Sequence, residues 1–308
     1  YMEPLVGSGN YRYSVHENWQ QPPEWLDVKA CAVSVDSQDR VYSFNRNDAH
    51  PVVIFDRNGK FLSSWGEGLF KFPHAIRIVQ ENGEDRVWLC DEHHNQFYKF
   101  TTDGKLLQTI GEKGARSDTG VPASEWSSAA FKQVTHGGGP FNLPTDIAFA
   151  PDGSMFMTDG YGNARVHKFS PDAKYQFSWG EPGTAPGQFN LPHGVWIDSR
   201  GRVLVADREN DRVQVFDQGG KFLHVWPVEL IGPAFFYIDK DDIVYIPEHN
   251  GGMVSLLTLD GERLARWGDG PIMRSIHGIW GDSRGDFYCV QPGSWQPRAR
   301  RVVKYERV

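Results

Sequence analysis

The sequence predicts an all-β fold, a six-bladed β-propeller, and three observations support this prediction. A unit of roughly forty residues recurs six times along the 308-residue chain. Each unit reads as four short strands separated by turns rich in glycine and aspartate. Helical periodicity is nearly absent, since the one candidate helix, around residues 123–133, is short and flanked by glycine. Four-stranded units that repeat in this way are typical of blades arranged around an axis.

The fullest copy of the unit covers residues 190–227, "NLPHGVWIDSRGRVLVADRENDRVQVFDQGGKFLHVWP". It contains an apolar strand, a turn, a second strand that ends in Ala-Asp, a polar loop, a third strand, a glycine turn and a fourth strand. Alternation such as "RVQVF" favours strands. The other copies cover residues 33–66, 72–111, 142–180, 232–268 and the chain from 275 onward.

The two ends of the chain are expected to complete one blade together. The last copy starts at Ser275 and ends in "RRVVKYERV" without a fourth strand, which "NYRYSVH", residues 10–16, can supply. Blades cannot bury their faces alone, so residues 1–308 are predicted to form a single domain. Two β-sandwiches would not explain the recurrence. The insertion at 112–140 is either a lid or pocket wall, or a loop without a role.

Composition excludes several classes of partner. The net charge is −7 and no basic stripe is present, so nucleic acid is not an expected partner. No apolar stretch approaches the roughly 18 residues of a membrane span. Three scattered cysteines do not form a disulfide framework, and no signal peptide is visible, so a cytoplasmic location is expected.

Histidine recurs in register in every second copy. Alignment on the first strands places at one position Cys31, His74, Thr145, His193, Ala234 and His277. In a six-fold ring, the three imidazoles would converge on the axis about 120° apart. A single histidine near the axis is usually a channel residue, but three in register indicate a catalytic zinc site with an open fourth position. Iron, cobalt or manganese also bind imidazole.

Three further residues are predicted to lie over the histidines. Arg46, Tyr161 and Arg208 follow second strands, which end on the face where first strands begin. Positive charge on a metal and two guanidiniums favours a phenolate, which can act as a general base. Arginine suits a carboxylate, so the expected substrate is a small molecule with a hydroxyl and a carboxylate or amide. Arg208 belongs to ordinary repeat sequence and can also brace its blade.

Several segments resemble known families. The P-x-G-[VI] openings and the "ADRENDRV" centre resemble NHL repeats. The segments "KFPHAIRI", "TDGYGNAR", "NLPHGVWI" and "VADRENDRVQVF" resemble peptidyl-α-hydroxyglycine α-amidating lyases. This resemblance implies Zn²⁺ bound by the three in-register histidines, Tyr161 as base, and Arg46 and Arg208 at the substrate. It implies a lyase that cleaves the C–N bond of a small α-hydroxy amide (a carbinolamide), releasing an amide and a carbonyl product such as glyoxylate.

The chain also departs from that family. The resemblance places a structural calcium at the carbonyls of Val33 and Ile76 and at a carboxylate, but Gly278 occupies the carboxylate position, so calcium is not expected. The cysteine that follows the family's tyrosine is Gly162 here, and a pocket methionine is Ser275. The substrate is therefore expected to differ: another α-hydroxy amide, a ureidoglycolate-like compound, or one that undergoes hydration or dehydration.

Two other classes of function compete with the lyase. A propeller lactonase or other hydrolase would use calcium ligands near the axis, but the in-register positions hold no carboxylate. A metal-dependent hydratase that acts on a small molecule is a further alternative. A non-catalytic NHL-type scaffold that binds protein would not need alternating histidines. Metal content and metal identity separate the three classes.

Overall fold

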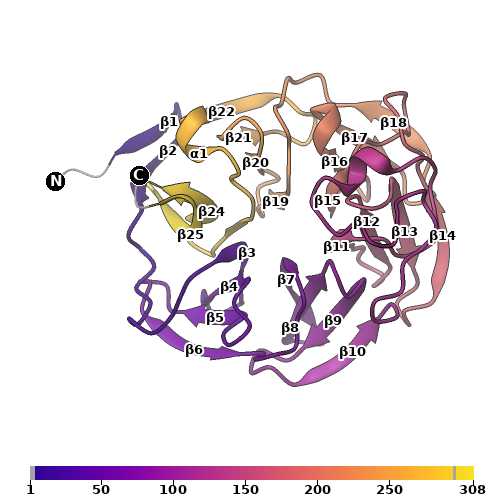
Figure 1. The fold of residues 1–308 in the computed structure, drawn as a ribbon. Helices are drawn as coiled ribbons and strands as arrows, with labels where there is room; N and C mark the ends of the chain where they lie inside the picture. Colours follow the sequence, from indigo (N-terminus) through magenta and orange to yellow (C-terminus); the bar gives the residue numbers. More distant parts are fainter. Residues whose placement is uncertain (1–3, 294–295) are drawn as a thin grey trace.

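The computed structural model describes residues 4–293 and 296–308 and confirms a six-bladed β-propeller (Figure 1). The blades follow one another around a central axis, and each is an antiparallel sheet whose first strand is innermost. The first blade consists of β3 (Ala30–Val35), β4 (Val41–Asn45), β5 (Val52–Phe55) and β6 (Phe61–Trp65). The second consists of β7 (Pro73–Glu81), β8 (Glu84–Asp91), β9 (Gln96–Phe100) and β10 (Leu106–Ile110).

The next three blades repeat this order. The third consists of β11 (Pro144–Phe149), β12 (Met155–Asp159), β13 (Arg165–Phe169) and β14 (Tyr175–Trp179). The fourth consists of β15 (Pro192–Ile197), β16 (Val203–Asp207), β17 (Arg212–Phe216) and β18 (Phe222–Val225). The fifth consists of β19 (Tyr237–Ile238), β20 (Val244–Glu248), β21 (Met253–Leu257) and β22 (Arg263–Gly268).

The last blade joins the two ends of the chain, as the sequence predicts. Its strands are β23 (Ile279–Gly281), β24 (Phe287–Gly293), β25 (Gln296–Arg307), β2 (Tyr11–His16) and β1 (Leu5–Ser8). Strand β2 pairs antiparallel with β25, so residues close to both termini share one sheet. Strand β1, which the repeat pattern did not predict, adds a fifth strand outside β2.

Helices are few and short in the described part of the chain. They are two 3₁₀ turns, Ala130–Gln133 and Arg208–Asn210, and the four-residue helix α1 (Gly270–Met273). The first of these is the only helical turn in the segment 123–133 where the sequence suggested a helix. Among the described residues, no helix has the length and apolar character needed to cross a membrane.

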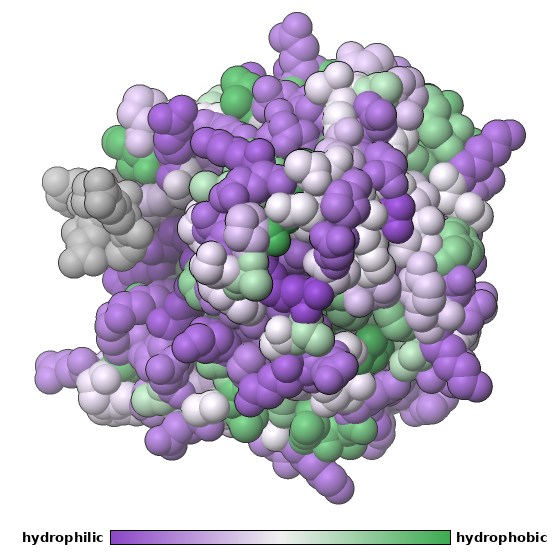
Figure 2. Space-filling model, turned by 45° about the vertical axis from the view of Figure 1, so that its right-hand side comes forward, coloured by the Kyte–Doolittle hydropathy of each residue, from purple (hydrophilic) through white to green (hydrophobic). Residues whose placement is uncertain are grey.

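Tryptophans at the outer strands tie neighbouring blades together. The Trp65 ring of the first blade covers the turn that contains Gly104 in the second blade, where φ is +92°. A Cβ atom on Gly104 would lie 2.7 Å from that ring, so the turn requires glycine both for its conformation and for this contact. Most apolar side chains are buried within and between the blades. The face of the molecule in Figure 2 is accordingly mostly hydrophilic, with small separate hydrophobic patches.

A β-bulge determines where the in-register residues point. Between the first and second strands of the first four blades, the register shifts by one residue, and the residues skipped are Cys31, His74, Thr145 and His193. A bulge leaves one residue outside the ladder and redirects its side chain. In these four blades the repeated sequence thus takes one side chain out of the ladder and turns it toward the axis.

Candidate metal centre and active site

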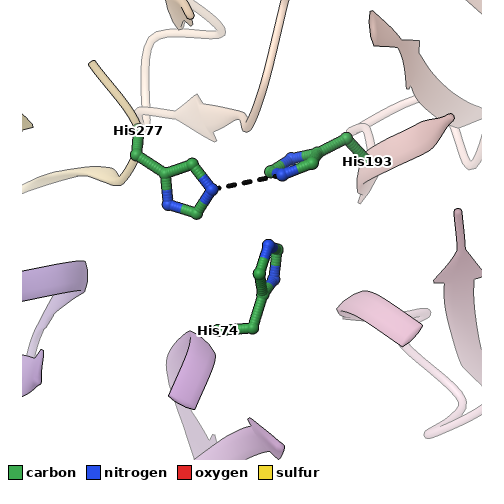
Figure 3. A group of neighbouring side chains, drawn as sticks. All are labelled: His74, His193 and His277. Atoms are coloured by element: carbon green, nitrogen blue, oxygen red, sulfur yellow. Dashed lines mark hydrogen bonds between the residues drawn. The ribbon is translucent and has the colours of Figure 1, made fainter. Parts of the chain in front are cut away.

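Three histidines from alternate blades converge on the axis, as the register predicts (Figure 3). His74, His193 and His277 are buried, and their ligand nitrogens all lie within 4.8 Å of one another. His74 and His193 are presented by bulges in β7 and β15. His277 lies just before β23 and is fixed by its backbone N–H, which donates to Val290 O over 2.8 Å.

The residues in register on the other three blades orient these rings. Each histidine directs Nδ1 at the carbonyl oxygen of the next blade's in-register residue: His74 at Thr145 (2.6 Å), His193 at Ala234 (2.9 Å) and His277 at Cys31 (2.5 Å). The alternation along the chain therefore has two functions. Histidine blades supply a ring, and the blades between them supply a backbone acceptor that fixes its tautomer.

This tautomer directs the lone pairs of three ring nitrogens toward the centre of the triad. A carbonyl oxygen only accepts, so each Nδ1 carries the hydrogen and each Nε2 a lone pair. Yet His193 Nε2 and His277 Nε2 lie only 3.1 Å apart, the contact dashed in Figure 3, and His74 Nε2 has no hydrogen-bond partner among the described residues. Lone pairs facing each other repel unless a cation lies among them. Three buried imidazole nitrogens thus fit a divalent transition metal such as zinc.

The electrostatics of the site keep the histidines neutral. Burial is the largest cause that lowers the pKa of His74, His193 and His277 well below the ordinary value. Nearby positive charge adds to the effect, foremost from Arg46 on His74 and from Arg300 on His277. Neutral imidazole is the form that binds metal, so no proton has to be displaced from the ligand nitrogens.

Tyr161 links the triad to an arginine. Its hydroxyl oxygen lies 3.2 Å from His193 Nε2 and accepts a hydrogen bond of 3.0 Å from Arg208 Nη1. Because His193 Nε2 carries a lone pair, Tyr161 donates its own hydrogen to that nitrogen. The Nε atom of Arg208 donates to Glu209 over 2.8 Å, which fixes the guanidinium beside the phenol.

A cavity of about 580 Å³ opens over these groups. It is lined by Tyr161, Arg208, His277 and also Arg46, the remaining residue predicted for the site. The Arg46 guanidinium lies 3.8 Å from the centre of the Phe72 ring. The structure therefore brings together all the residues that the sequence assigned to the site.

The insertion between the second and third blades forms part of the cavity wall. Trp126, Ser127 and Ser128 line it, and the Trp126 ring contacts His93 with 5.3 Å between ring centroids. The Arg116 guanidinium, also in the insertion, lies 4.5 Å from the Trp126 ring and fixes it.

Three other lining residues were not assigned a role from the sequence: Glu92, His249 and Arg300. Glu92 and His249 directly follow β8 and β20, so they occupy the position of Arg46 and Arg208 in other blades, and that register is the signal for them. Burial lowers the pKa of His249 to about 3. Arg300, from β25, belongs to the one blade whose sequence departs most from the repeat.

The channel below the triad does not fit a calcium ion. Val33, Ile76 and Gly278 surround a space of only about 10 Å³ there. Arg77 already places a guanidinium in this channel, with Nη2 3.3 Å from Asp146 Oδ2 and 3.0 Å from a carbonyl. Calcium needs six to eight oxygen ligands, and the carboxyl group of Asp146, which also lines this space, is already paired with Arg77.

The repeats define the class of protein. Residues 189–216 match the family model described as the NHL repeat, and the chain folds as a six-bladed β-propeller. Solved propellers share the fold: a streptogramin B lyase (TM-score 0.63, 13% identity, 97% of this chain and 99% of that one) and a gluconolactonase from Xanthomonas campestris (TM-score 0.66, 12% identity, 99% and 95%).

More specific similarity is found among curated proteins. The chain is 32% identical over 223 residues to human NHL repeat-containing protein 3, covering 70% of this chain and 59% of that protein. It is 32% identical over 209 residues to peptidyl-alpha-hydroxyglycine alpha-amidating lyase 1 of Drosophila melanogaster, covering 64% and 34%. The chain is also 32% identical over 205 residues to the rat peptidylglycine alpha-amidating monooxygenase, covering 64% of this chain and 18% of that protein. The chain spans less than two thirds of these relatives and resembles an amidating lyase.

Proposed function

We propose that the protein is a zinc-dependent lyase that cleaves the C–N bond of a small α-hydroxy amide. The products would be an amide and a carbonyl compound such as glyoxylate. The observation that carries the proposal is the position of the Tyr161 hydroxyl, in contact with both His193 Nε2 and Arg208 Nη1. The similarity to the Drosophila amidating lyase supports this choice of reaction.

His74, His193 and His277 would hold the metal through Nε2. When bound, a divalent ion supplies Lewis-acid polarisation of a substrate oxygen. Tyr161 Oη would accept the proton of the substrate hydroxyl as the C–N bond breaks, and the hydrogen bond from Arg208 Nη1 holds Oη in place for the transfer.

Arg46 and Arg208 would bind the substrate carboxylate. They come from the first and fourth blades and face one cavity, so a small anion can contact both. Guanidinium groups form paired hydrogen bonds with a carboxylate, which fixes the orientation of the α-carbon that carries the hydroxyl. The proposed partner is therefore a small molecule that carries a carboxylate.

A non-catalytic role is the competing proposal. Similarity to human NHL repeat-containing protein 3 extends over 70% of the chain, and the name of that relative specifies no reaction. A scaffold of this kind has no need of three histidines whose Nε2 atoms converge on one point. A metal-dependent hydratase would use the same histidines and differ in its products.

Metal content and product formation test the proposal together. We expect about one zinc per chain, and release of benzamide and glyoxylate in equal amounts from N-benzoyl-α-hydroxyglycine. His193→Ala should lose both the metal and the activity. His224→Ala, on the outer strand of the same blade, is the matched control and should keep both. Metal-free wild-type protein, or zinc retained in His193→Ala, would contradict the metal site.

A further inference from the structure

We infer that Glu92 is a second acid–base residue of this site, which donates a proton to the nitrogen that leaves when the C–N bond breaks. The inference rests on the proposed lyase function and adds the proton donor that this reaction lacks. It starts from a buried carboxyl group in the cavity that none of the roles described so far uses.

The backbone places Glu92 over the triad. It directly follows Asp91, the last residue of β8, as Arg46 follows β4 and Arg208 follows β16. Its backbone N–H donates to Phe72 O over 3.1 Å, and its side chain lines the same cavity as Tyr161 and His277. Glu92 therefore reaches the cavity from the second blade.

The carboxyl group of Glu92 is buried without a hydrogen-bond partner. The residue is 1% exposed, and among the described residues Oε1 has no hydrogen bond. The Nε2 atom of His93 lies 3.6 Å from Oε1, which is longer than a hydrogen bond. The His93 ring cannot swing closer freely, because it is stacked on Phe72 at 4.2 Å and contacts Trp126. A buried, unpartnered polar group of this kind requires an explanation.

The surroundings of Glu92 favour its neutral acid form. Burial raises the pKa of the Glu92 carboxyl, and the negative charge of Asp91 adds to this. His93 and the Arg46 guanidinium oppose the shift without cancelling it. A raised pKa moves Glu92 toward the neutral form, and a carboxyl group in that form is a hydrogen-bond and proton donor. Because Oε1 has no partner among the described residues, we infer that its partner is a group of the substrate.

The reaction needs such a donor because an amide anion is a poor leaving group. The hydroxyl proton passes to Tyr161 Oη, and the O–H electron pair forms the carbonyl bond. The C–N electron pair passes to nitrogen, which takes the proton from Glu92. No atom is oxidised or reduced. The proton on Tyr161 then returns to Glu92 through solvent, which restores both groups. A positioned general acid contributes roughly 10²–10⁴-fold in rate.

The leaving-group dependence of the rate tests this role. The probes are N-benzoyl-α-hydroxyglycines whose ring substituents run from methoxy to nitro, so that the departing amide becomes progressively more stable as an anion. Glu92→Gln should lose on the order of 10²–10⁴-fold in kcat with the methoxy compound and far less with the nitro compound. Wild-type rates should vary little across the series. Glu84→Gln, at the exposed start of the same strand, is the control and should behave as wild type.

An equal loss across the series would overturn the inference, because it would mean that Glu92 binds or positions the substrate instead of protonating it. Unchanged rates would overturn it too. Glu92→Asp, which keeps the carboxyl group, should retain the shallow dependence even if slowed, and it replaces Glu92→Gln if that variant does not fold. Zinc content and thermal unfolding of each variant separate a lost proton donor from a damaged site.

Infrared difference spectra provide a readout that needs no turnover. Wild type minus Glu92→Gln at neutral pH should show the carbonyl stretch of a protonated carboxylic acid, and Glu92→Asp should shift that band. A carboxylate band in its place would overturn the inference whatever the substrate is. If no probe releases glyoxylate but the acid band is present, the proposed lyase reaction fails while the neutral carboxyl group of Glu92 stands.

Discussion

His193 Nε2 and His277 Nε2 face each other at 3.1 Å while the Nδ1 atom of each ring is bound to a backbone carbonyl. Neither nitrogen of the pair therefore has a proton to share with the other. This arrangement costs free energy when no metal is bound, because two buried acceptors face each other and only His193 Nε2 has a donor among the described residues, the Tyr161 hydroxyl. A metal ion removes the repulsion, which couples metal binding to the stability of the propeller.

Removal of the metal is thus expected to destabilise the wild-type protein. At a free zinc concentration of about 100 times Kd, binding adds about 2.7 kcal/mol to the free energy of unfolding. Thermal unfolding with and without a zinc chelator such as phenanthroline measures the effect. His277→Ala should be insensitive to the chelator, whereas His224→Ala should respond as wild type does. A chelator-independent midpoint in wild type would contradict the coupling.

Tyr161→Phe is expected to lower kcat by roughly 10²–10⁴-fold while zinc content stays at wild-type level. The substitution removes only the oxygen that contacts His193 and Arg208, so the ring packing of the buried phenyl group persists. Steady-state kinetics beside metal analysis measure both quantities. Tyr175→Phe, an exposed tyrosine on the outer strand β14 of the same blade, is the control. Activity retained by Tyr161→Phe would exclude this residue as the base.

Features that recur in every repeat can be predicted from the sequence, whereas features that occur in one blade only cannot. The blades, the closure by residues 10–16 and the register of the three histidines follow from the repeat, because each copy carries the same signal. Glu92 occupies the same register as Arg46, but its residue type differs, so a search for arginine or tyrosine passes over it. The repeat also gives no information about which atom orients each histidine ring, since the acceptors are backbone carbonyls.

Contacts between side chains of different blades cannot be predicted from the repeated sequence, because no single repeat contains both partners. Arg77 and Asp146 come from different blades, 69 residues apart, and meet only because both side chains enter one narrow channel. Arg300 enters the cavity from the last blade, where the repeat pattern is weakest. Such pairings depend on how the ring closes and not on any single unit.

Removal of one partner of the Arg77–Asp146 pair is expected to lower the free energy of unfolding strongly. Arg77→Met would leave the Asp146 carboxyl buried beside two backbone N–H groups without its cation, at a cost of about 3–5 kcal/mol. Arg77→Met combined with Asp146→Asn removes both charges and should cost less than the single change. Urea unfolding of the two variants and wild type gives the comparison. A double variant less stable than Arg77→Met would show that the pair is not a coupled unit.

The same pair predicts a pH dependence of stability. Burial raises the pKa of Asp146 to about 6, with Arg77 opposing, whereas the unfolded value is about 3.9. The folded state therefore binds more protons than the unfolded state between those values. This contribution to stability is fully present below about pH 4 and is lost as pH rises through 6. Chemical unfolding from pH 4 to 7 measures the slope, and Asp146→Asn should remove this part of it. An identical slope in that variant would refute the assignment.

Gly278→Asp is expected to destabilise the propeller without creating a calcium site. The substitution supplies the carboxylate that a calcium ion at this position would need, but a Cβ atom there would lie 2.8 Å from Ala32 Cα and 3.1 Å from Val33 N. Backbone atoms at that distance cannot move apart without a substantial cost in free energy. The guanidinium of Arg77 also places a positive charge in the channel, which disfavours a calcium ion there. Thermal unfolding of wild type and Gly278→Asp with calcium or EGTA tests this. The variant should unfold at a lower temperature, and calcium should shift neither midpoint. A calcium-dependent rise in Gly278→Asp would mean that the channel can open to admit the ion, and that only the missing carboxylate excludes calcium from the natural protein.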